Sequence, residues 1–336
     1  MSFRPLLPPS ISCVIPAYNE ARNLTRLVPQ ALATLRQLSP HIELIVVDDG
    51  SRDDTAAVMQ TLCAAHEQLV SIKLSRNFGK ESALTAGIDL AIGDVVILMD
   101  ADGQHPLALL ADMLAKWQQG ADVVYAVRKN RQDQSAMQVR LTALFYKLVN
   151  WGSPIEIPPN AGDFRLMDRQ VVNALKTLSE RNRFMKGLYA WVGFNSTAID
   201  YDPLPRTDGV TRFGLGGSFR LALTGMVAFS TVPLRLLTWF GMLLAIVALA
   251  YGGWAVLEYF IWGASVPGYA TLVVSMMFFS GIQLLGLGIL AEYVGRIYDE
   301  VKRRPSYIVA QRNGNGLDAD PGGLSVSSDS AGPGQA

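Results

Sequence analysis

The sequence predicts an α/β fold, a mostly parallel sheet covered by helices, followed by two C-terminal transmembrane helices. Two observations lead to this class. Between residues 11 and 126, short apolar runs rich in Val and Ile alternate with segments of helical length and period. Further on, residues 236–257 and 270–291 carry no charged side chain, and each run is long enough to cross about 30 Å of hydrocarbon at 1.5 Å per residue.

The predicted strands are short and uniformly apolar, as strands buried on both faces of a parallel sheet are. They are residues 11–15, 44–47, 70–74, 95–99 and 123–126. Helical spacing of apolar residues predicts helices between them at residues 21–38, 54–66, 82–91 and 106–118. Either Asp53 or Asp54, and Pro106, are suitable helix starts.

The composition excludes several classes of protein. Of 336 residues, 50% are hydrophobic and 17% are charged, and the formal net charge is zero, so no global field favours nucleic acid. The two cysteines, Cys13 and Cys63, fall in a predicted strand and a predicted helix, which indicates reduced thiols in a cytosolic domain. Residues 1–10 lack the apolar core of a signal peptide.

An acidic turn is the strongest chemical signal. Asp100, Asp102 and Gln104 follow the apolar run 95–99 directly. Carboxylates two residues apart at the end of a buried strand can share a divalent cation, and hard oxygen ligands favour Mg²⁺ or Mn²⁺ bound together with substrate phosphates. A loop rich in Asp and Gly with no metal is the alternative. Two further polar clusters, residues 19–20 and 48–51, also follow predicted strands, so three clusters converge on the edge where parallel sheets bind ligands.

Charges around the apolar runs predict how the chain crosses the membrane. Residues 262–269 between the runs have no Lys or Arg, whereas Arg235 precedes the first run and Arg296 and residues 302–304 follow the second. The positive-inside bias therefore predicts a multi-pass protein of the inner (cytoplasmic) membrane with both termini cytoplasmic. Residues 213–232 form either an amphipathic helix in the membrane interface or a helix packed on the domain.

Several motifs resemble those of one enzyme family. Residues 14–20 (VIPAYNE), 47–51 (VDDGS), 75–80 (SRNFGK), 100–104 (DADGQ) and 162–166 (GDFRL) resemble the successive motifs of family 2 glycosyltransferases with the nucleotide-diphospho-sugar (GT-A) fold. Arg206, Gly209 and the blocks 211–213 and 229–235 resemble the polyprenyl-phosphate branch, which includes dolichyl-phosphate mannosyltransferase and bacterial undecaprenyl-phosphate glucosyltransferase. The resemblance covers about residues 10–305 and is specific through its joint spacing.

The resemblance implies boundaries along the chain. Together with the composition of the C-terminal third, it divides the chain into a cytoplasmic GT-A catalytic domain at 1–210, an amphipathic juxtamembrane segment at 211–234, transmembrane helices at 235–262 and 269–294, a basic cytoplasmic segment at 295–312 and a disordered tail at 313–336.

The resemblance also implies roles for individual residues. The metal ligands would be Asp100, Asp102 and Gln104, holding Mg²⁺ or Mn²⁺. The donor-binding residues would be Pro16, Ala17, Tyr18, Glu20, Asp49, Lys80, Asp100 and Ala101, with Lys80 alternatively only beginning a helix.

Cations would serve both phosphates. Arg128, Arg206 and Arg212 match family cations near the donor diphosphate and the acceptor phosphate, since a guanidinium fork suits phosphate oxygens. Arg140 is a further candidate for the lipid phosphate, with Arg131 as its rival. Residues 211–213 (TRF) depart from the usual Ser-Lys-aromatic pattern, so a fork replaces a point charge there.

Asp163 matches a carboxylate sometimes assigned as the catalytic base. Because a phosphate monoester is largely ionised at neutral pH, it needs little deprotonation, and we interpret Asp163 as an orienting or electrostatic group in catalysis with Asp102. A helix cap for residues 165–178 is the structural alternative.

The sequence thus predicts an inverting, metal-dependent hexosyltransferase acting on polyprenyl (undecaprenyl) phosphate at the lipid bilayer, with UDP-glucose favoured and GDP-mannose second. Alternatives are an amino-arabinose-type or N-acetylated sugar, and a non-catalytic scaffold or translocation subunit for lipid-linked sugar. A processive synthase is disfavoured because the chain lacks a Gln-x-x-Arg-Trp block. Relatives imply a homo-oligomer, a tetramer among the options, and glycines in both apolar runs permit close helix packing.

Overall fold

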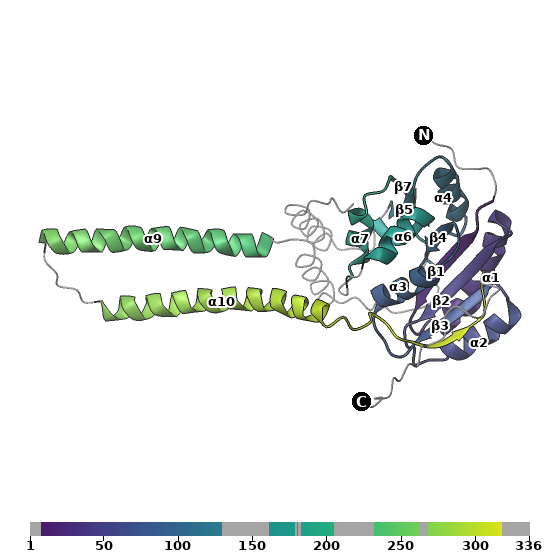
Figure 1. Cartoon of the computed structure of the whole chain (residues 1–336), viewed down its shortest axis with the longest axis horizontal. Coiled ribbons are helices and arrows are strands. Elements are labelled where there is room, and N and C mark those ends of the chain that lie inside the picture. Colours follow the sequence, from purple (N-terminus) through teal and green to yellow (C-terminus); the bar gives the residue numbers. More distant parts are fainter. Residues whose placement is uncertain are drawn as a thin grey trace, which may run out of the picture.

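A computed structural model describes residues 8–129, 161–178, 180, 183–204, 232–262 and 268–317 of the chain. Its sheet has the strand order β7-β5-β6-β4-β1-β2-β3-β8 within this part of the chain (Figure 1). The parallel central strands are β1 (Ile11–Ala17), β2 (Ile42–Asp48), β3 (Leu69–Leu74) and β4 (Val95–Leu98). The helices that connect them are α1 (Ala21–Leu38), α2 (Thr55–Ala65) and α3 (Lys80–Leu90).

The central strands are buried on both faces, as their apolar sequences predict. Every residue of β1 and β2 is buried, and alternate residues enter different clusters: Cys13 and Ile15 pack with α1 on one face, Val14 with α3 on the other. α1 supplies its apolar stripe at helical spacing, and α3 lies so close that a Cβ at Gly87 would meet the Val14 side chain. This close contact holds α3 against β1.

The second half of the sheet is mixed. It contains β5 (Val123–Arg128), β6 (Ala161–Asp168) and β7 (Ser196–Tyr201), together with α4 (Leu109–Gln118), α6 (Arg169–Thr177) and α7 (Met185–Trp191). β6 runs antiparallel to both of its neighbours, β4 and β5. α6 begins with Asp168 as its cap, whose carboxylate accepts a hydrogen bond from the Gln170 amide. The helix-cap alternative for Asp163 is therefore wrong, because that residue lies within a strand.

Two long helices leave the domain side by side as a hairpin: α9 (Val232–Trp262) and α10 (Tyr269–Val301) (Figure 1). Both are long and apolar enough to cross a membrane, and no side chain that the structure describes in the candidate spans, Leu237–Trp254 and Ser275–Val301, is buried. α10 continues past residue 294, where the second transmembrane helix was expected to end.

The chain returns from α10 to the sheet, which corrects one sequence-based boundary. β8 (Val309–Asn313) pairs antiparallel with β3, and Leu317 donates its amide to the Glu43 carboxylate. The sheet thus draws on residues well beyond 210, and the segments expected as a basic stretch (295–312) and a disordered tail (313–336) contain this strand and its continuation. Residues 318–336, and residues 211–231 of the expected juxtamembrane segment 211–234, lie outside the described residues, whereas 232–234 begin α9.

Candidate active site

The acidic turn lies at the carboxyl end of β4, where the sequence analysis expects it. Asp102 accepts the Gln104 amide at Oδ1 (3.0 Å), and Gly103 between them has a φ of +70°, which a glycine adopts without strain. Ala101 is buried, while the side chains of Asp100 and Asp102 are only partly covered. The turn therefore presents two carboxylates at the edge of the sheet.

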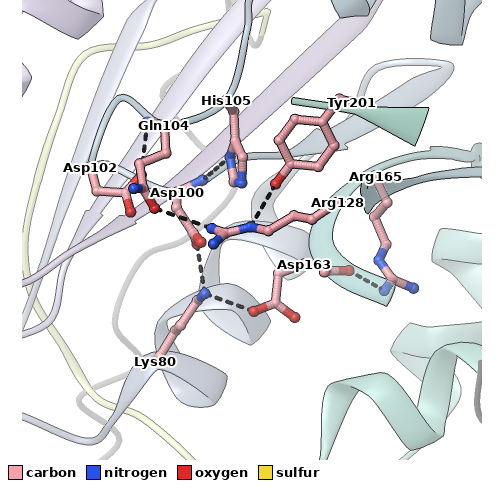
Figure 2. A network of polar contacts seen from close by, with 10 residues as sticks. Lys80, Asp100, Asp102, Gln104, His105, Arg128, Asp163, Arg165 and Tyr201 are labelled. Carbon is pink, nitrogen blue, oxygen red and sulfur yellow. Dashed lines mark hydrogen bonds and ion pairs between the residues drawn. The ribbon is translucent and has the colours of Figure 1, made fainter. Parts of the chain in front are cut away.

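Lys80 connects this turn to β6. As the first residue of α3, it places its Nζ 2.6 Å from Asp100 Oδ1 and 2.7 Å from Asp163 Oδ2 (Figure 2). Burial alone would lower the pKa of Lys80, but the two carboxylates outweigh it and raise that pKa, so the ammonium stays protonated. Burial works against the ionised form of Asp163 as well, yet the charge of Lys80 lowers the pKa of Asp163 to about 2.

Arg128 approaches from the end of β5. Its guanidinium donates to Gln104 Oε1 at 3.1 Å and to the Tyr201 hydroxyl at 3.2 Å (Figure 2). The amide oxygen that the resemblance assigns to a metal is thus engaged by a cation. Lys80 and Arg128 together put two positive charges beside three carboxylates.

An aromatic wall backs the site, and the sequence analysis did not assign it a role. The His105 ring stacks on Phe164 with centroids 4.4 Å apart, and Tyr201 meets both rings edge-on. His105 Nδ1 accepts the Asp100 amide at 3.2 Å, as a neutral imidazole does, and burial lowers the pKa of His105. His105 lies in the loop directly after the acidic motif and helps to shape the turn. Its position next to the acidic motif was the only signal in the sequence.

A cluster of buried polar side chains lies beside Asp163. The Arg165 guanidinium lies over the Tyr189 ring, 3.4 Å from its centroid, and donates to the Gly162 carbonyl at 2.7 Å. Among the described residues, Asp163 Oδ1, Arg165 Nε and the Tyr189 hydroxyl are buried without a hydrogen-bond partner. Such unsatisfied atoms are costly, and their concentration beside the site is typical of a functional region.

The strand ends of β1 and β2 hold the expected donor-binding loops. Pro16 and Ala17 end β1, and Tyr18 and Glu20 follow it. Asn19 has a φ of +56°, and its backbone amide donates a hydrogen bond to the Ser51 hydroxyl oxygen, so the two loops are joined.

Asp49 organises the loop before α3. Its two carboxylate oxygens accept the amides of Phe78 (2.7 Å) and Gly79 (2.9 Å). A carboxylate has further lone pairs, so its expected contact with a nucleotide stays a prediction. In the structure, Asp49 thereby positions Lys80, the residue that follows this loop.

The expected site residues are therefore brought together only in part. Asp100, Asp102, Gln104, Lys80, Arg128 and Asp163 converge, and the β1 and β2 loops lie at the same edge of the sheet. Arg140, Arg206 and Arg212, and the rival Arg131, lie outside the described residues. In the part of the chain that is described, no three His, Cys, Asp or Glu side chains form a cluster that could hold a metal by themselves.

A helix-covered parallel sheet with this acidic turn at its strand ends defines a glycosyltransferase of the GT-A type. Residues 12–176 match the family model described as Glycosyl transferase family 2, and residues 232–297 match one described as GtrB C-terminal hairpin. The chain belongs to glycosyl transferase family 2.

Relatives match over most of the chain. An uncharacterised glycosyltransferase of Synechocystis sp. is 45% identical over 89% of this chain and 94% of its own. A prophage-derived bactoprenol glucosyl transferase of Shigella flexneri is 41% identical over 89% and 97%, and a prophage homologue in Escherichia coli is 41% identical over 89% and 98%. Among solved structures, a mannosyltransferase from Pyrobaculum calidifontis in complex with GDP-Man and Mn²⁺ is 17% identical over 89% of each chain, with a TM-score of 0.44.

Proposed function

We propose that this protein transfers glucose, with inversion, from UDP-glucose to a polyprenyl phosphate at the cytoplasmic face of the membrane. The observation that carries the proposal is the convergence of Asp100, Asp102 and Asp163 with Lys80 and Arg128 at the strand ends, on a domain that continues into an apolar hairpin. Relatives named bactoprenol glucosyl transferase, at 41% identity over most of both chains, support the sugar and the lipid carrier.

The acidic turn fits a divalent cation in its chemistry. Asp100 and Asp102 are both carboxylates, partly exposed and two residues apart. Mg²⁺ and Mn²⁺ are commonly held by one or two carboxylates plus substrate phosphates. Among the described residues no third acidic or imidazole side chain completes a metal-binding cluster, so this turn suits an ion that arrives with a diphosphate. When bound, such an ion would stabilise the departing nucleoside diphosphate as a Lewis acid.

The residues of the chain have separate tasks in this reaction. Lys80 and Arg128 supply positive charge for the diphosphate, and Arg128 is held in place by Gln104 and Tyr201. Preorganised charge of this kind lowers the barrier because it needs no rearrangement when the bond breaks. Pro16, Ala17, Tyr18, Glu20 and Ala101 surround the nucleotide from the neighbouring strand ends.

Asp163 acts as a fixed negative charge and not as a general base. With a pKa of about 2, it is ionised at neutral pH and far from the matched pKa that efficient proton transfer requires. The acceptor phosphate is already largely ionised and can attack directly. Asp163 therefore orients Lys80 and favours the positive charge that develops on the sugar ring, and direct displacement inverts the anomeric centre.

The α9–α10 hairpin brings the lipid to the site. Its apolar side chains are exposed along both candidate spans, which water would strongly disfavour and a bilayer would accept. The start of α9 and the end of α10 lie at the same end of the hairpin, toward the sheet domain (Figure 1). Both ends of the hairpin would then face the cytoplasm, with the domain at the inner leaflet.

Purified full-length protein in detergent tests this function directly. Undecaprenyl phosphate is supplied with radiolabelled UDP-glucose, GDP-mannose or UDP-N-acetylglucosamine, each with Mg²⁺ or Mn²⁺, and lipid-linked sugar is extracted and counted. We expect a β-linked glucosyl lipid from UDP-glucose. Product from GDP-mannose alone would assign the mannosyltransferase alternative, and no product from any donor would leave a non-catalytic scaffold.

A further inference from the structure

We propose that Lys80 is an internal cation that occupies Asp100 until a divalent ion displaces it, so that the site binds the metal together with the donor diphosphate and only weakly alone. This inference rests on the proposed metal dependence of the acidic turn. It concerns Lys80, which was expected to contact the nucleotide or to begin a helix. Lys80 does begin α3, and its side chain in addition links Asp100, the proposed metal ligand, to Asp163 (Figure 2).

The geometry puts the lysine in competition with a metal. Its Nζ lies 2.6 Å from Asp100 Oδ1, which is within the distance of a charge-assisted hydrogen bond. A divalent ion coordinated by the same carboxylate would be close to a protonated ammonium and repelled by it. Lys80 must therefore withdraw from Asp100 when the ion binds.

The two partners of Lys80 differ in a way that decides which one is released. The Asp163 side chain is 14% exposed, whereas that of Asp100 is 28% exposed. Ion pairs are weakened by solvent, so the pair with Asp163 is the stronger one. Asp163 also has a second oxygen, Oδ1, that is buried with no hydrogen-bond partner among the described residues, so loss of Lys80 would leave its charge poorly compensated. Asp100 is the partner that exchanges.

The backbone position of Lys80 is fixed. Asp49 holds the amides of Phe78 and Gly79, and Lys80 follows as the first residue of α3. Withdrawal from Asp100 therefore involves only rotation of the lysine side chain, which is 44% exposed and has room to move.

The charges of the site explain why metal and donor would bind together. Asp100, Asp102 and Asp163 contribute three negative charges, against one positive charge each from Lys80 and Arg128. A divalent ion alone would make this group net positive, whereas an ion accompanied by a diphosphate would not. The released ammonium can then pair with the diphosphate.

Titration with Mn²⁺ alone, followed by electron paramagnetic resonance on the full-length protein in detergent, tests the proposal. No donor or acceptor is present. We expect Lys80→Met, which keeps the alkyl chain and removes the charge, to bind Mn²⁺ roughly tenfold more tightly than the wild type. Lys80→Gln is a second variant that retains a donor for Asp163, and it should shift in the same direction. Melting temperatures establish that both variants are folded.

Two matched variants identify the cause. Lys186→Met removes a nearby charge that also acts on Asp163, while in the described part of the chain the ion pair with Asp100 is made by Lys80. The Mn²⁺ affinity of this variant should stay at or near that of the wild type. In Asp100→Asn, adding Lys80→Met should produce no gain. Folded Lys80 variants with unchanged or weaker Mn²⁺ binding would overturn the proposal, as would a gain that persists in Asp100→Asn. If no variant binds Mn²⁺ even with UDP added, the metal dependence in the proposed function fails as well.

Discussion

The pKa values of two neighbouring carboxyl groups, Asp163 and Glu81, shift in opposite directions because their surroundings differ. Lys80 holds the pKa of Asp163 at about 2, although burial opposes it. Burial, and to a lesser extent the charge of Asp163, raise the pKa of Glu81, the next residue on α3, to about 7. Glu81 accepts the Met185 amide, which only partly offsets its burial. One residue is thus a permanent anion, while the other gains its charge near neutral pH.

Replacement of Asp102 by Asn should separate catalysis from folding. The substitution keeps the size of the side chain and the acceptor for the Gln104 amide but removes the charge that the proposed metal needs. We expect turnover to fall at least about a hundredfold with a melting temperature close to that of the wild type. Asp112→Asn, on an exposed position of α4, is the control and should leave both unchanged. Retained activity with unchanged metal dependence would argue against the site.

Glu81→Gln should change the pH dependence of stability. Because the pKa of Glu81 is raised on folding, its contribution is fully present below its ordinary value of 4.5 and is lost as pH rises through about 7. Gln has no such loss and can still accept the Met185 amide. The melting temperature of the variant relative to the wild type should therefore increase from pH 5 to pH 8. Parallel profiles across that range would contradict the assignment.

The sequence predicts the charged groups of the site better than the residues that pack around and position them. The acidic turn follows a strand that is easily predicted from its apolar composition. The family motifs then lead one to expect that Asp100, Asp102 and Gln104 lie close to Asp163 and Arg128. His105, Tyr201 and Glu81 could not be found in that way. His105 is at least next to the acidic motif, whereas Tyr201 and Glu81 become part of the site only through the pairing of β5 with β7 and the packing of α3 beside α7, which no local pattern records.

At the scale of elements, the strands with apolar sequences were predicted and those with polar residues were not. The five expected strands correspond to β1 to β5, and α1 spans the expected residues 21–38. β6 was missed because it buries Arg165 and carries Asp163, so its pattern resembles neither a buried nor a half-exposed strand. β8 was missed because an edge strand with exposed Gln311 and Arg312 has no apolar signature.

The segment after β8 packs closely against β3, and a substitution at Gly314 can test this packing. Gly314 has a φ of +85°, and a Cβ there would press on the carbonyl oxygen of Leu69. Gly314→Ala should therefore destabilise the domain by at least about 2 kcal/mol, through strain and the displaced strand. Gly193→Ala is the matched control, since it has a φ of +70° with only one contact near 4 Å and should cost about 1 kcal/mol. Equal melting temperatures for the two variants would show that β8 does not hold the sheet edge.

For the whole molecule, the position of the domain relative to the membrane is the functional question. The chain enters the hairpin at Val232 and returns from Val301 to a strand of the same sheet. Any movement of the hairpin would thus be transmitted to the sheet edge through a short connection. In the proposed function, the donor binds at the strand ends and the acceptor stays in the bilayer, so the tether would set the distance over which they meet.

The proposed topology predicts labelling from one side only. In intact bacterial cells, a membrane-impermeant maleimide should react with Ser265→Cys, between the two apolar helices, and not with Ser306→Cys, which follows α10. Both should react after the cells are opened. The parent chain, whose Cys13 is buried and whose Cys63 is partly covered, provides the background. Labelling of residue 306 in intact cells would reverse the orientation and place the site on the wrong side for a nucleotide sugar.

The most direct test of the account is the position of manganese in crystals grown with UDP-glucose, found from its anomalous diffraction. The account predicts a peak between the carboxylates of Asp100 and Asp102 and the diphosphate, with Lys80 withdrawn from Asp100. A nucleotide bound at the strand ends with manganese located away from this turn would contradict it.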